Sequence, residues 1–207
     1  MTDVVLKGTD GRPLAAKGQR TRLRLLESAE RVFAELGYND ASIVKITEAA
    51  GVGQGTFYLY FAGKSEIFDE LVRDLNRRVR RAMTEAARQG GNRIEAELHG
   101  FRAFFRFTAE HPALYRIIRQ AEFASPQTLQ FHYDKLVEGY KAALGRAMEA
   151  GEIERRDPEV LAWALMGIGE LIGMRYILWA ERPDVSEHVL DEIGRMIRCL
   201  LEPTEVA

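Results

Sequence analysis

The chain has a single cysteine among its 207 residues, Cys199, so it can form no disulfide within itself. Proline is scarce, with 6 residues, and no stretch gives a convincing strand, an internal repeat or a low-complexity segment. The 4 histidines are scattered without metal-ligand spacing, and we expect neither a metal nor a cofactor. What remains is a composition with 46% hydrophobic residues, which suits a helical globular protein with a core.

Signatures of catalysis are missing too. The sequence has no paired carboxylates, no nucleophile elbow, no phosphate-cradling glycine loop and no Cys/His constellation. We therefore do not expect an enzyme.

Membrane signals are weak. The start, Met-Thr-Asp-Val-Val-Leu-Lys-Gly, contains no apolar segment of a secretory signal. The longest apolar run, residues 160–180, is interrupted near its middle by Glu170 and Arg175. Because a charge at the centre of a membrane span is costly, we expect a buried helix of a soluble dimer and no membrane partner.

Residues 42–68 have the pattern of two short helices joined by a glycine turn, followed by the start of a third helix. Ser42 is a suitable N-cap, and residues 43–50 carry apolar side chains at helical spacing. Gly51 follows, at a position where glycine readily adopts the left-handed backbone of a helix end. This order is typical of a helix-turn-helix, which presents a helix to the DNA major groove.

The second of these helices is compact and spans residues 53–60. Phe57 and Phe61 lie four residues apart and are expected to share one inward face. Gly53 leaves room for close approach of the backbone to DNA. The side chains left to point elsewhere are those of Gln54, Thr56, Tyr58 and Tyr60. Gln and Thr can contact base edges, whereas Tyr hydroxyls commonly contact phosphates.

Lys64 is expected in the first turn of the next helix, where its charge opposes the helix dipole. A DNA phosphate at that N-terminus would remove the penalty and gain a charge-assisted contact. The competing interpretation makes Tyr58, Tyr60 and Phe61 ordinary core aromatics and Lys64 a solvated surface charge.

This stretch resembles the tetracycline-repressor (TetR) family of bacterial transcription regulators. The resemblance rests on Ala50-Gly51-Val52, on Phe57-Tyr58-Leu59-Tyr60-Phe61 and on Lys64 three residues later, with a matching helix before them at residues 21–36. It implies that Gln54 and Thr56 face bases. It also implies that the DNA backbone is faced by Ser42, Lys45, Tyr58, Tyr60 and Lys64. Family members usually carry a polar residue in place of Gly53, so the target sequence cannot be borrowed from relatives. With no signal segment at the start, we place the protein in the bacterial cytoplasm.

Positive charge is concentrated at the start of the chain. The whole chain has a formal net charge of −2, but residues 1–24 contain six Lys or Arg and two Asp, a net charge of +4. We expect residues 1–19 to form a basic flexible arm, and Arg20 and Arg22 to contact DNA in a salt-dependent way. The alternative is a tail that only aids solubility.

Beyond Lys64 the helical periodicity continues. We expect helices over residues 64–88, 92–111, 113–123, 126–150, 160–180 and 184–201, with N-caps that include Asn92, Asp157 and Asp184. The arginine-rich end of the first of them is interpreted as a solvated face. The prediction is an all-α fold of about nine helices. It has an N-terminal three-helix helix-turn-helix DNA-binding domain at residues 20–66 and a C-terminal helical ligand-binding and dimerisation domain at residues 67–207.

The last two long helices carry more apolar surface than one side of a helix needs. Together with their symmetry mates they could form a four-helix interface, and Gly169 and Gly173, one turn apart, would permit close approach of two helices. We therefore expect a homodimer. Its two-fold axis would set two recognition helices about one DNA turn apart, so the dimer would bind double-stranded DNA at a palindromic operator.

The second domain also has enough aromatic side chains for an apolar pocket that binds a small lipophilic effector. The alternative is an ordinary core, in which Glu170, Arg119 and their charged neighbours pair with each other or across the dimer. The candidate ligand-binding residues are Phe101, Phe104, Phe105, Tyr115, Arg119, Phe123, Tyr140, Trp163, Glu170 and Tyr176.

These observations together predict a ligand-responsive transcriptional repressor that is released from its operator by the effector. The alternative is an architectural helix-turn-helix DNA-binding protein without an effector. Such a protein would need only the first 64 residues and would have no pocket, which the aromatic-rich second domain speaks against.

Overall fold

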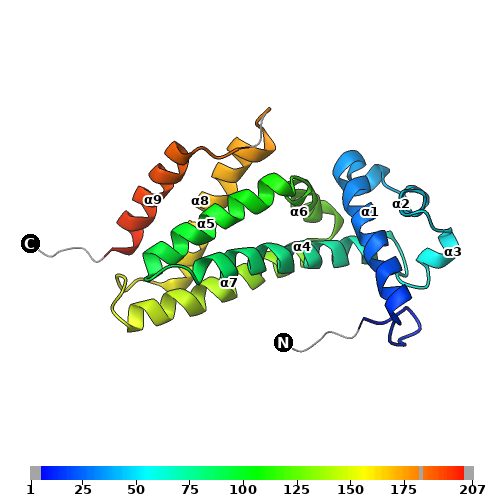
Figure 1. Ribbon diagram of the computed structural model, residues 1–207, viewed down its shortest axis with the longest axis horizontal. Helices are drawn as coiled ribbons and strands as arrows, with labels where there is room; N and C mark the ends of the chain where they lie inside the picture. The colour runs from blue at the N-terminus through cyan, green and yellow to red at the C-terminus, as the bar shows by residue number, and fades with distance from the viewer. Residues whose placement is uncertain (1–5, 182–183, 203–207) are drawn as a thin grey trace, which may run out of the picture. The chain divides into compact units, whose positions relative to one another are not determined.

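The computed structural model describes residues 6–181 and 184–202, and in these residues it contains helices and no strand (Figure 1). The elements are α1 (Ala16–Asp40), α2 (Ile43–Ala50), α3 (Gln54–Phe57), α4 (Lys64–Ala87), α5 (Arg93–Glu110), α6 (Ala113–Ala124), α7 (Pro126–Glu149), α8 (Pro158–Gly173), a π-helix (Met174–Leu178) and α9 (Glu187–Leu201). The predicted all-α fold and the predicted order of the helices are confirmed.

The chain forms two compact units. The first contains the residues up to Asp74 together with Arg116–Leu129, and the second contains Leu75–Tyr115 and the residues from Gln130 onwards. The first unit therefore extends beyond the predicted boundary at residue 66, because it includes the first part of α4, most of α6 and the start of α7.

Capping side chains begin several helices where the sequence predicts them. Ser42 accepts a hydrogen bond from the backbone N–H of Lys45, and Asn92 accepts one from Glu95. Asp157 caps α8 through two backbone N–H groups, and Pro158 follows it in the first turn. One predicted cap is wrong: α9 is capped by Ser186 rather than by Asp184, so the helix begins two residues later than that cap predicts.

Helix α1 begins earlier and ends later than the sequence predicts. It starts at Ala16, so α1 takes the last four residues of the predicted flexible arm at residues 1–19. Gly37, with φ of 78°, interrupts the helix where the sequence predicts its end, but one more turn follows to Asp40. Ahead of the helix, residues 6–14 form a small loop closed by an isolated β-bridge between Lys7 and Pro13.

Aromatic side chains fill the core of the first unit. Phe33, Phe57, Phe61 and Phe68 are each no more than 1% exposed, so the predicted inward face of Phe57 and Phe61 is confirmed. Phe68 packs edge-on against the rings of both Phe33 and Tyr38. This core fixes α1 and the start of α4 behind the two short helices.

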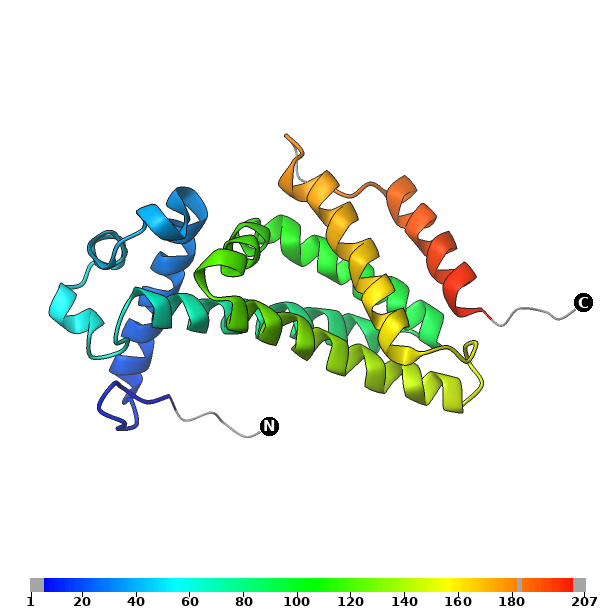
Figure 2. The ribbon, with the colours of Figure 1, turned by 180° about the vertical axis from the view of Figure 1, so that it is seen from behind.

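The second unit is built around α5, which packs against α8, the π-helix and α9 (Figure 2). Gly169 and Gly173 lie on the buried side of α8. A methyl group on Gly173 would be 1.7 Å from the hydroxyl of Tyr115, and one on Gly169 would touch Phe101 and Phe104. The expected role of these glycines in approach between two subunits is therefore wrong, because both pack against aromatic rings of their own chain.

Within the described residues, one segment, Pro158–Leu178, is long and apolar enough to cross a membrane. Only 39% of its most apolar stretch is buried, but core helices of soluble proteins meet the same criterion. Glu170, near its middle, accepts a hydrogen bond from the hydroxyl of Tyr133 at 2.8 Å. The charged group thus has a partner inside the unit, and the segment is weak evidence for a membrane span.

Candidate DNA interface and ligand cavity

The turn between α2 and α3 has the geometry that the sequence predicts. Gly51 adopts the left-handed conformation, with φ of 62°, and ends α2. Gly53 occupies the N-cap position of α3, which is a single turn of four residues and so is shorter than the predicted helix of residues 53–60. Phe57 anchors this turn in the core, and Tyr58 at its end is 50% exposed. The opposite edge of α3 is therefore presented to solvent by a rigidly held helix.

The predicted DNA contacts fall into two groups by exposure. The exposed group consists of Arg20, Lys45, Gly53, Gln54 and Tyr58. The partly buried group consists of Arg22, Ser42, Thr56, Tyr60 and Lys64. Gln54 is thus free of the core and positioned on the exposed edge of α3. Lys45 lies on α2, where its ammonium group reaches the carbonyl of Asp40 at 3.2 Å.

Lys64 is held by its own chain. Its ammonium group donates hydrogen bonds to the carbonyls of Tyr38 at 2.8 Å, Ala41 at 3.0 Å and Asn39 at 3.3 Å. It also lies over the ring of Tyr38, 4.5 Å from the centroid. An ammonium group has three N–H donors, and these three carbonyls can accept from all of them. The arrangement therefore favours a structural tie between α4 and the end of α1, and a phosphate contact stays a prediction.

Arg22 is likewise engaged within its own unit. Its guanidinium lies 3.5 Å from the carboxylate of Glu70 and stacks over Phe61, and its side chain is 12% exposed. A contact with DNA would need this pair to separate. The sequence could not reveal either role, because the partners of Arg22 and Lys64 are more than twenty residues away along the chain.

The loop before α1 is attached to the end of α3. Thr9 donates through its hydroxyl to the carbonyl of Tyr58 at 2.9 Å and through its backbone N–H to the carbonyl of Leu59 at 3.0 Å. Lys7 and Arg12 are exposed on the same loop. Part of the predicted flexible arm is therefore a folded element that braces the predicted DNA-reading turn.

The predicted ligand residues do not gather in one place. Arg119 and Phe123 belong to the first unit and are exposed, Phe123 by 87%. Trp163 is 45% exposed. The core of the second unit takes up Phe101, Phe104, Phe105 and Tyr115. Glu170 bonds to Tyr133, and Tyr176 lies under the guanidinium of Arg175. Most of these aromatic side chains therefore pack as an ordinary core, the alternative that the sequence left open.

A cavity of about 500 Å³ lies in the second unit between the end of α4, the start of α5 and α7. Of the ten predicted ligand residues, Tyr140 alone lines it. The complete lining is Arg80, Met83, Thr84, Ala87, Arg88, Arg93, Ala96, Glu97, Gly100, Leu136, Gly139, Tyr140, Ala143 and Arg146. The lining combines apolar side chains with four arginines, so the cavity suits a molecule with both apolar and polar parts.

Burial changes the acid–base properties of two of the lining side chains. Burial raises the pKa of the Glu97 carboxyl group, while the neighbouring guanidinium of Arg93 opposes that rise. Burial and the charge of Glu97 together raise the pKa of the Tyr140 hydroxyl well above its usual value. Sequence reasoning missed Arg93 and Glu97, although a basic and an acidic residue four apart in an otherwise apolar helix face were a usable signal.

No group of three or more His, Cys, Asp or Glu side chains in the described part of the chain could hold a metal ion.

A helix-turn-helix with an exposed recognition edge, joined to a helical unit with a cavity, defines a DNA-binding transcriptional regulator. Comparison with known proteins agrees: residues 25–71 match the family model of the bacterial regulatory proteins of the tetR family. The uncharacterized HTH-type transcriptional regulator YdgC of Bacillus subtilis is 31% identical over 170 residues, which cover 80% of this chain and 85% of YdgC. The chain belongs to the tetR family. It is a regulator of transcription and not an enzyme.

Solved structures share the fold over nearly the whole chain. A TetR-family regulator from Syntrophomonas wolfei superimposes with a TM-score of 0.74 at 22% identity, covering 88% of this chain and 95% of that one. The transcriptional regulator FadR from Bacillus subtilis, in complex with stearoyl-CoA, gives a TM-score of 0.72 at 20% identity, covering 84% and 96%. At these identities the likeness establishes the fold.

Proposed function

We propose that this regulator is a repressor that binds a palindromic operator as a homodimer in the bacterial cytoplasm and leaves it when a small lipophilic effector binds. The observation that carries the proposal is the pairing of an exposed recognition edge at Gln54 and Tyr58 with a cavity of about 500 Å³ in the other compact unit of the same chain.

The recognition edge supports sequence-specific binding. Gln54 is exposed at the first position of α3, where its amide can bond bidentately to adenine. Tyr58 is half exposed at the end of the same turn, where its hydroxyl can reach a phosphate. Phe57 beneath them is fully buried, so the edge is presented by a fixed backbone.

Exposed apolar side chains on α8 and α9, and at Trp179 between them, support a dimer. Trp179 and Val160 are 63% and 67% exposed, and Leu171 is 63% exposed. Trp163 on α8 and Met196 on α9 are also more than two-fifths exposed. Such a patch is a liability on a free monomer and is typical of an interface. A two-fold axis through these helices would space two recognition helices for a palindrome.

The cavity supports a ligand. The stearoyl-CoA bound by FadR of Bacillus subtilis indicates that a fold of this kind can hold an acyl chain. For release, the effector must bind the geometry that is incompatible with DNA more tightly than the compatible one, with a coupling of typically ~1–3 kcal/mol.

The test begins with selection of bound duplexes from a random library by the purified chain. We expect an inverted repeat, bound by a species of twice the monomer mass in light scattering, and loss of binding when acyl thioesters or other lipophilic compounds are added. A monomeric chain that is indifferent to inverted repeats at low salt would overturn the proposal.

The alternative, an architectural DNA binder without an effector, predicts a different outcome. It predicts that chemically diverse lipophilic ligands cause no thermal shift and leave the operator affinity unchanged. The cavity between α4, α5 and α7 speaks against it, because a purely architectural protein has no need to leave such a volume open.

A further inference from the structure

The cavity between α4, α5 and α7 has an unusual charge balance. Its lining contains four arginines, Arg80, Arg88, Arg93 and Arg146, and a single carboxylate, Glu97, which leaves a formal excess of three positive charges. Charged groups of one sign around a concave surface raise the local potential and attract the opposite sign. The wall therefore suits an anion.

Among the described residues, Arg93 alone of these arginines has a carboxylate partner, whereas Arg80 bonds to the amide of Asn76. Arg88, directly after α4, and Arg146 on α7 are exposed, and neither forms an ion pair within residues 6–181 and 184–202. Arg81, on α4 one to two turns before Arg88, does have a partner, since its guanidinium bonds to Glu85 at 2.7 Å. Arg88 and Arg146 thus line the cavity without an ion pair among the described residues.

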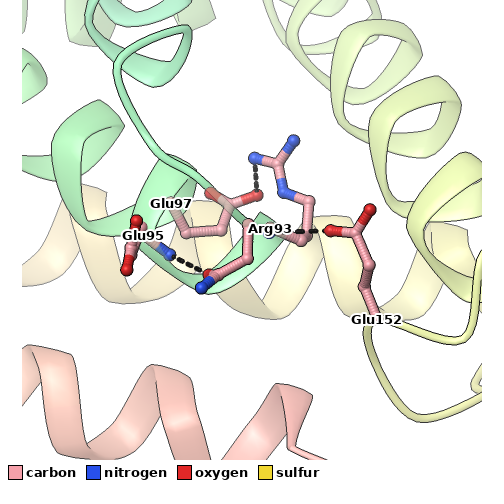
Figure 3. Close-up of polar contacts among 5 residues, drawn as sticks. Arg93, Glu95, Glu97 and Glu152 are labelled. Carbon is pink, nitrogen blue, oxygen red and sulfur yellow. Dashed lines mark hydrogen bonds and ion pairs between the residues drawn. The ribbon is translucent and has the colours of Figure 1, made fainter.

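Arg93 lies deeper, at the start of α5, with its side chain 15% exposed (Figure 3). One terminal nitrogen of its guanidinium bonds to the carboxylate of Glu97, which is 2% exposed. Its Nε–H is buried and has no hydrogen-bond partner in the described part of the chain. A buried donor without a partner costs on the order of 1–3 kcal/mol, so an acceptor brought by a ligand would relieve this cost.

The backbone around Arg93 holds the side chain in place. Its N–H donates to the carboxylate of Glu152 at 2.9 Å, while Asn92 caps the helix through the N–H of Glu95 at 2.9 Å (Figure 3). Glu97, one turn further along α5, keeps the guanidinium against the cavity wall. Glu97 is therefore a positioning residue for Arg93.

The rest of the lining is apolar or small. Met83, Ala87 and Leu136 contribute hydrocarbon surface, as do Ala96 and Ala143. Gly100 and Gly139 leave space on the two facing helices, because a methyl group at either position would touch nothing within 4 Å. A hydrocarbon chain can occupy this part while its polar end meets the arginines.

We propose that this cavity binds an amphiphile with a single hydrocarbon chain and an anionic head group, which Arg93 receives through its unsatisfied Nε–H while the exposed Arg88 and Arg146 also hold it. The inference rests on the proposed function in treating the cavity as the effector site, and it names the chemistry of the effector. A carboxylate and the phosphates of an acyl thioester share this chemistry.

The test uses the full-length chain and three probes with the same chain length: dodecanoate, dodecanol and dodecanoyl-coenzyme A. Binding is measured by calorimetry below the micellar concentration. We expect dodecanoate or the thioester to bind at least ten-fold more tightly than dodecanol, with an advantage that shrinks as salt is raised. Equal affinity for dodecanoate, thioester and alcohol would overturn the inference.

Matched variants test where in the cavity the anionic head group binds. The double variant Arg88→Gln/Arg146→Gln changes only exposed, unpaired side chains, so it should fold normally, lose about ten-fold in affinity for the anions and keep its affinity for dodecanol. Arg81→Gln removes an arginine from α4 but outside the cavity, and should change neither. If the double variant bound the anions like the parent, the head group would not be where we place it.

Arg93 is tested by Arg93→Lys and Arg93→Met. The lysine variant keeps the charge opposite Glu97 and so protects folding, but it loses the Nε–H, and we expect weaker anion binding. If anion affinity stayed at the parent value in Arg93→Lys and in a folded Arg93→Met, Arg93 would not be the receptor.

The same binding data distinguish a carboxylate head group from the phosphates of an acyl thioester. Preference for the thioester that depends on Arg88 and Arg146 indicates phosphates at these two arginines, whereas preference for dodecanoate indicates a carboxylate at Arg93. Operator binding, measured in parallel, separates this inference from the proposed function. If the chain bound the anions selectively but did not release DNA, effector release would be refuted and the anionic head group would stand. If dodecanol released DNA as effectively as the anions did, the anionic head group would be refuted and effector release would stand.

Discussion

The side-chain amide of Asn76, on α4, donates to both the ring Nδ1 and the backbone carbonyl of His132, on α7, at 3.1 and 3.0 Å. The carbonyl oxygen of the same amide accepts from Nε of Arg80, a residue of the cavity wall, at 2.8 Å. Both Asn76 and His132 are buried. The link therefore ties α4 to α7 in a state in which Nδ1 accepts, which requires a neutral ring.

This link predicts that acid destabilises the second unit. Burial, helped by the charge of Arg80, lowers the pKa of His132 from 6.5 to about 4. The unfolded chain takes up a proton near pH 6.5 and the folded chain does not, so stability is complete above pH 6.5 and falls as the pH drops towards 4. The loss amounts to roughly 3 kcal/mol at most.

Urea unfolding from pH 7.5 to 4 provides the measurement. His132→Gln should lower stability at neutral pH and flatten its decline between pH 6.5 and 4, whereas His188→Gln, at an exposed position on α9, should leave the pH profile intact. An unchanged profile in His132→Gln would show that other groups cause the acid sensitivity.

At α3, base reading and phosphate binding should depend on different side chains. Gln54→Ala removes an exposed amide at the start of the helix and should change the preferred operator sequence. Tyr58→Phe should weaken binding to all sequences by a similar factor, because a phosphate contact carries no base information. Selection from a random duplex library reports both. A Gln54→Ala profile identical to that of the parent would contradict the base-reading role.

Lys64 should contribute to folding before it contributes to DNA binding. Lys64→Met leaves the carbonyls of Tyr38, Asn39 and Ala41 without their ammonium partner, and we expect the chain to lose about 1–3 kcal/mol of stability. Thermal unfolding without DNA is the measurement. An unchanged melting temperature together with weaker, salt-dependent DNA binding would instead assign Lys64 to a phosphate.

The loop before α1 should act on DNA affinity by bracing α3. Thr9→Val removes the hydroxyl that bonds to Tyr58, and we expect a few-fold loss of operator affinity that is the same at low and high salt. Arg12→Gln, on the same loop, tests a charge contact, whose contribution must fall as salt rises. A Thr9→Val variant with the affinity of the parent would show that the loop is a passive appendage.

A side chain at Gly173 should destabilise the fold. A methyl group there would lie 1.7 Å from the Tyr115 hydroxyl, so Gly173→Ala should cost about 1–3 kcal/mol through overpacking. Gly167→Ala, on the same helix, meets nothing within 4 Å and should stabilise the chain by up to ~1 kcal/mol, since alanine favours helices. Chemical denaturation of the two variants should therefore give shifts of opposite sign.

Much of the fold follows from local sequence. The cap at Ser42, the turn at Gly51 and the start of α8 at Asp157 each depend on hydrogen bonds within a few residues, and the sequence predicts all three. For α9 the sequence predicts a cap two residues too early, because Asp184 and Ser186 are both suitable caps and only the path of the chain into α9 selects Ser186.

The candidate ligand site could not be read in the same way. Its wall combines side chains near residues 80–88, 93–100 and 136–146, which only the packing of α4, α5 and α7 brings together. The aromatic residues that suggested a pocket instead fill the core, because burying a large ring stabilises the fold whether or not a ligand binds.

By itself, the sequence determined a chain of helices with a helix-turn-helix near its start, since helix ends, tight turns and apolar stripes are encoded by neighbours along the chain. Tertiary structure alone decided which charges remain available. It ties Lys64 to the end of α1 and Arg22 to Glu70, and it leaves Arg88 and Arg146 lining a cavity. The reason is physical: whether a charged side chain is satisfied depends on partners that are distant in sequence and become neighbours only when the helices pack.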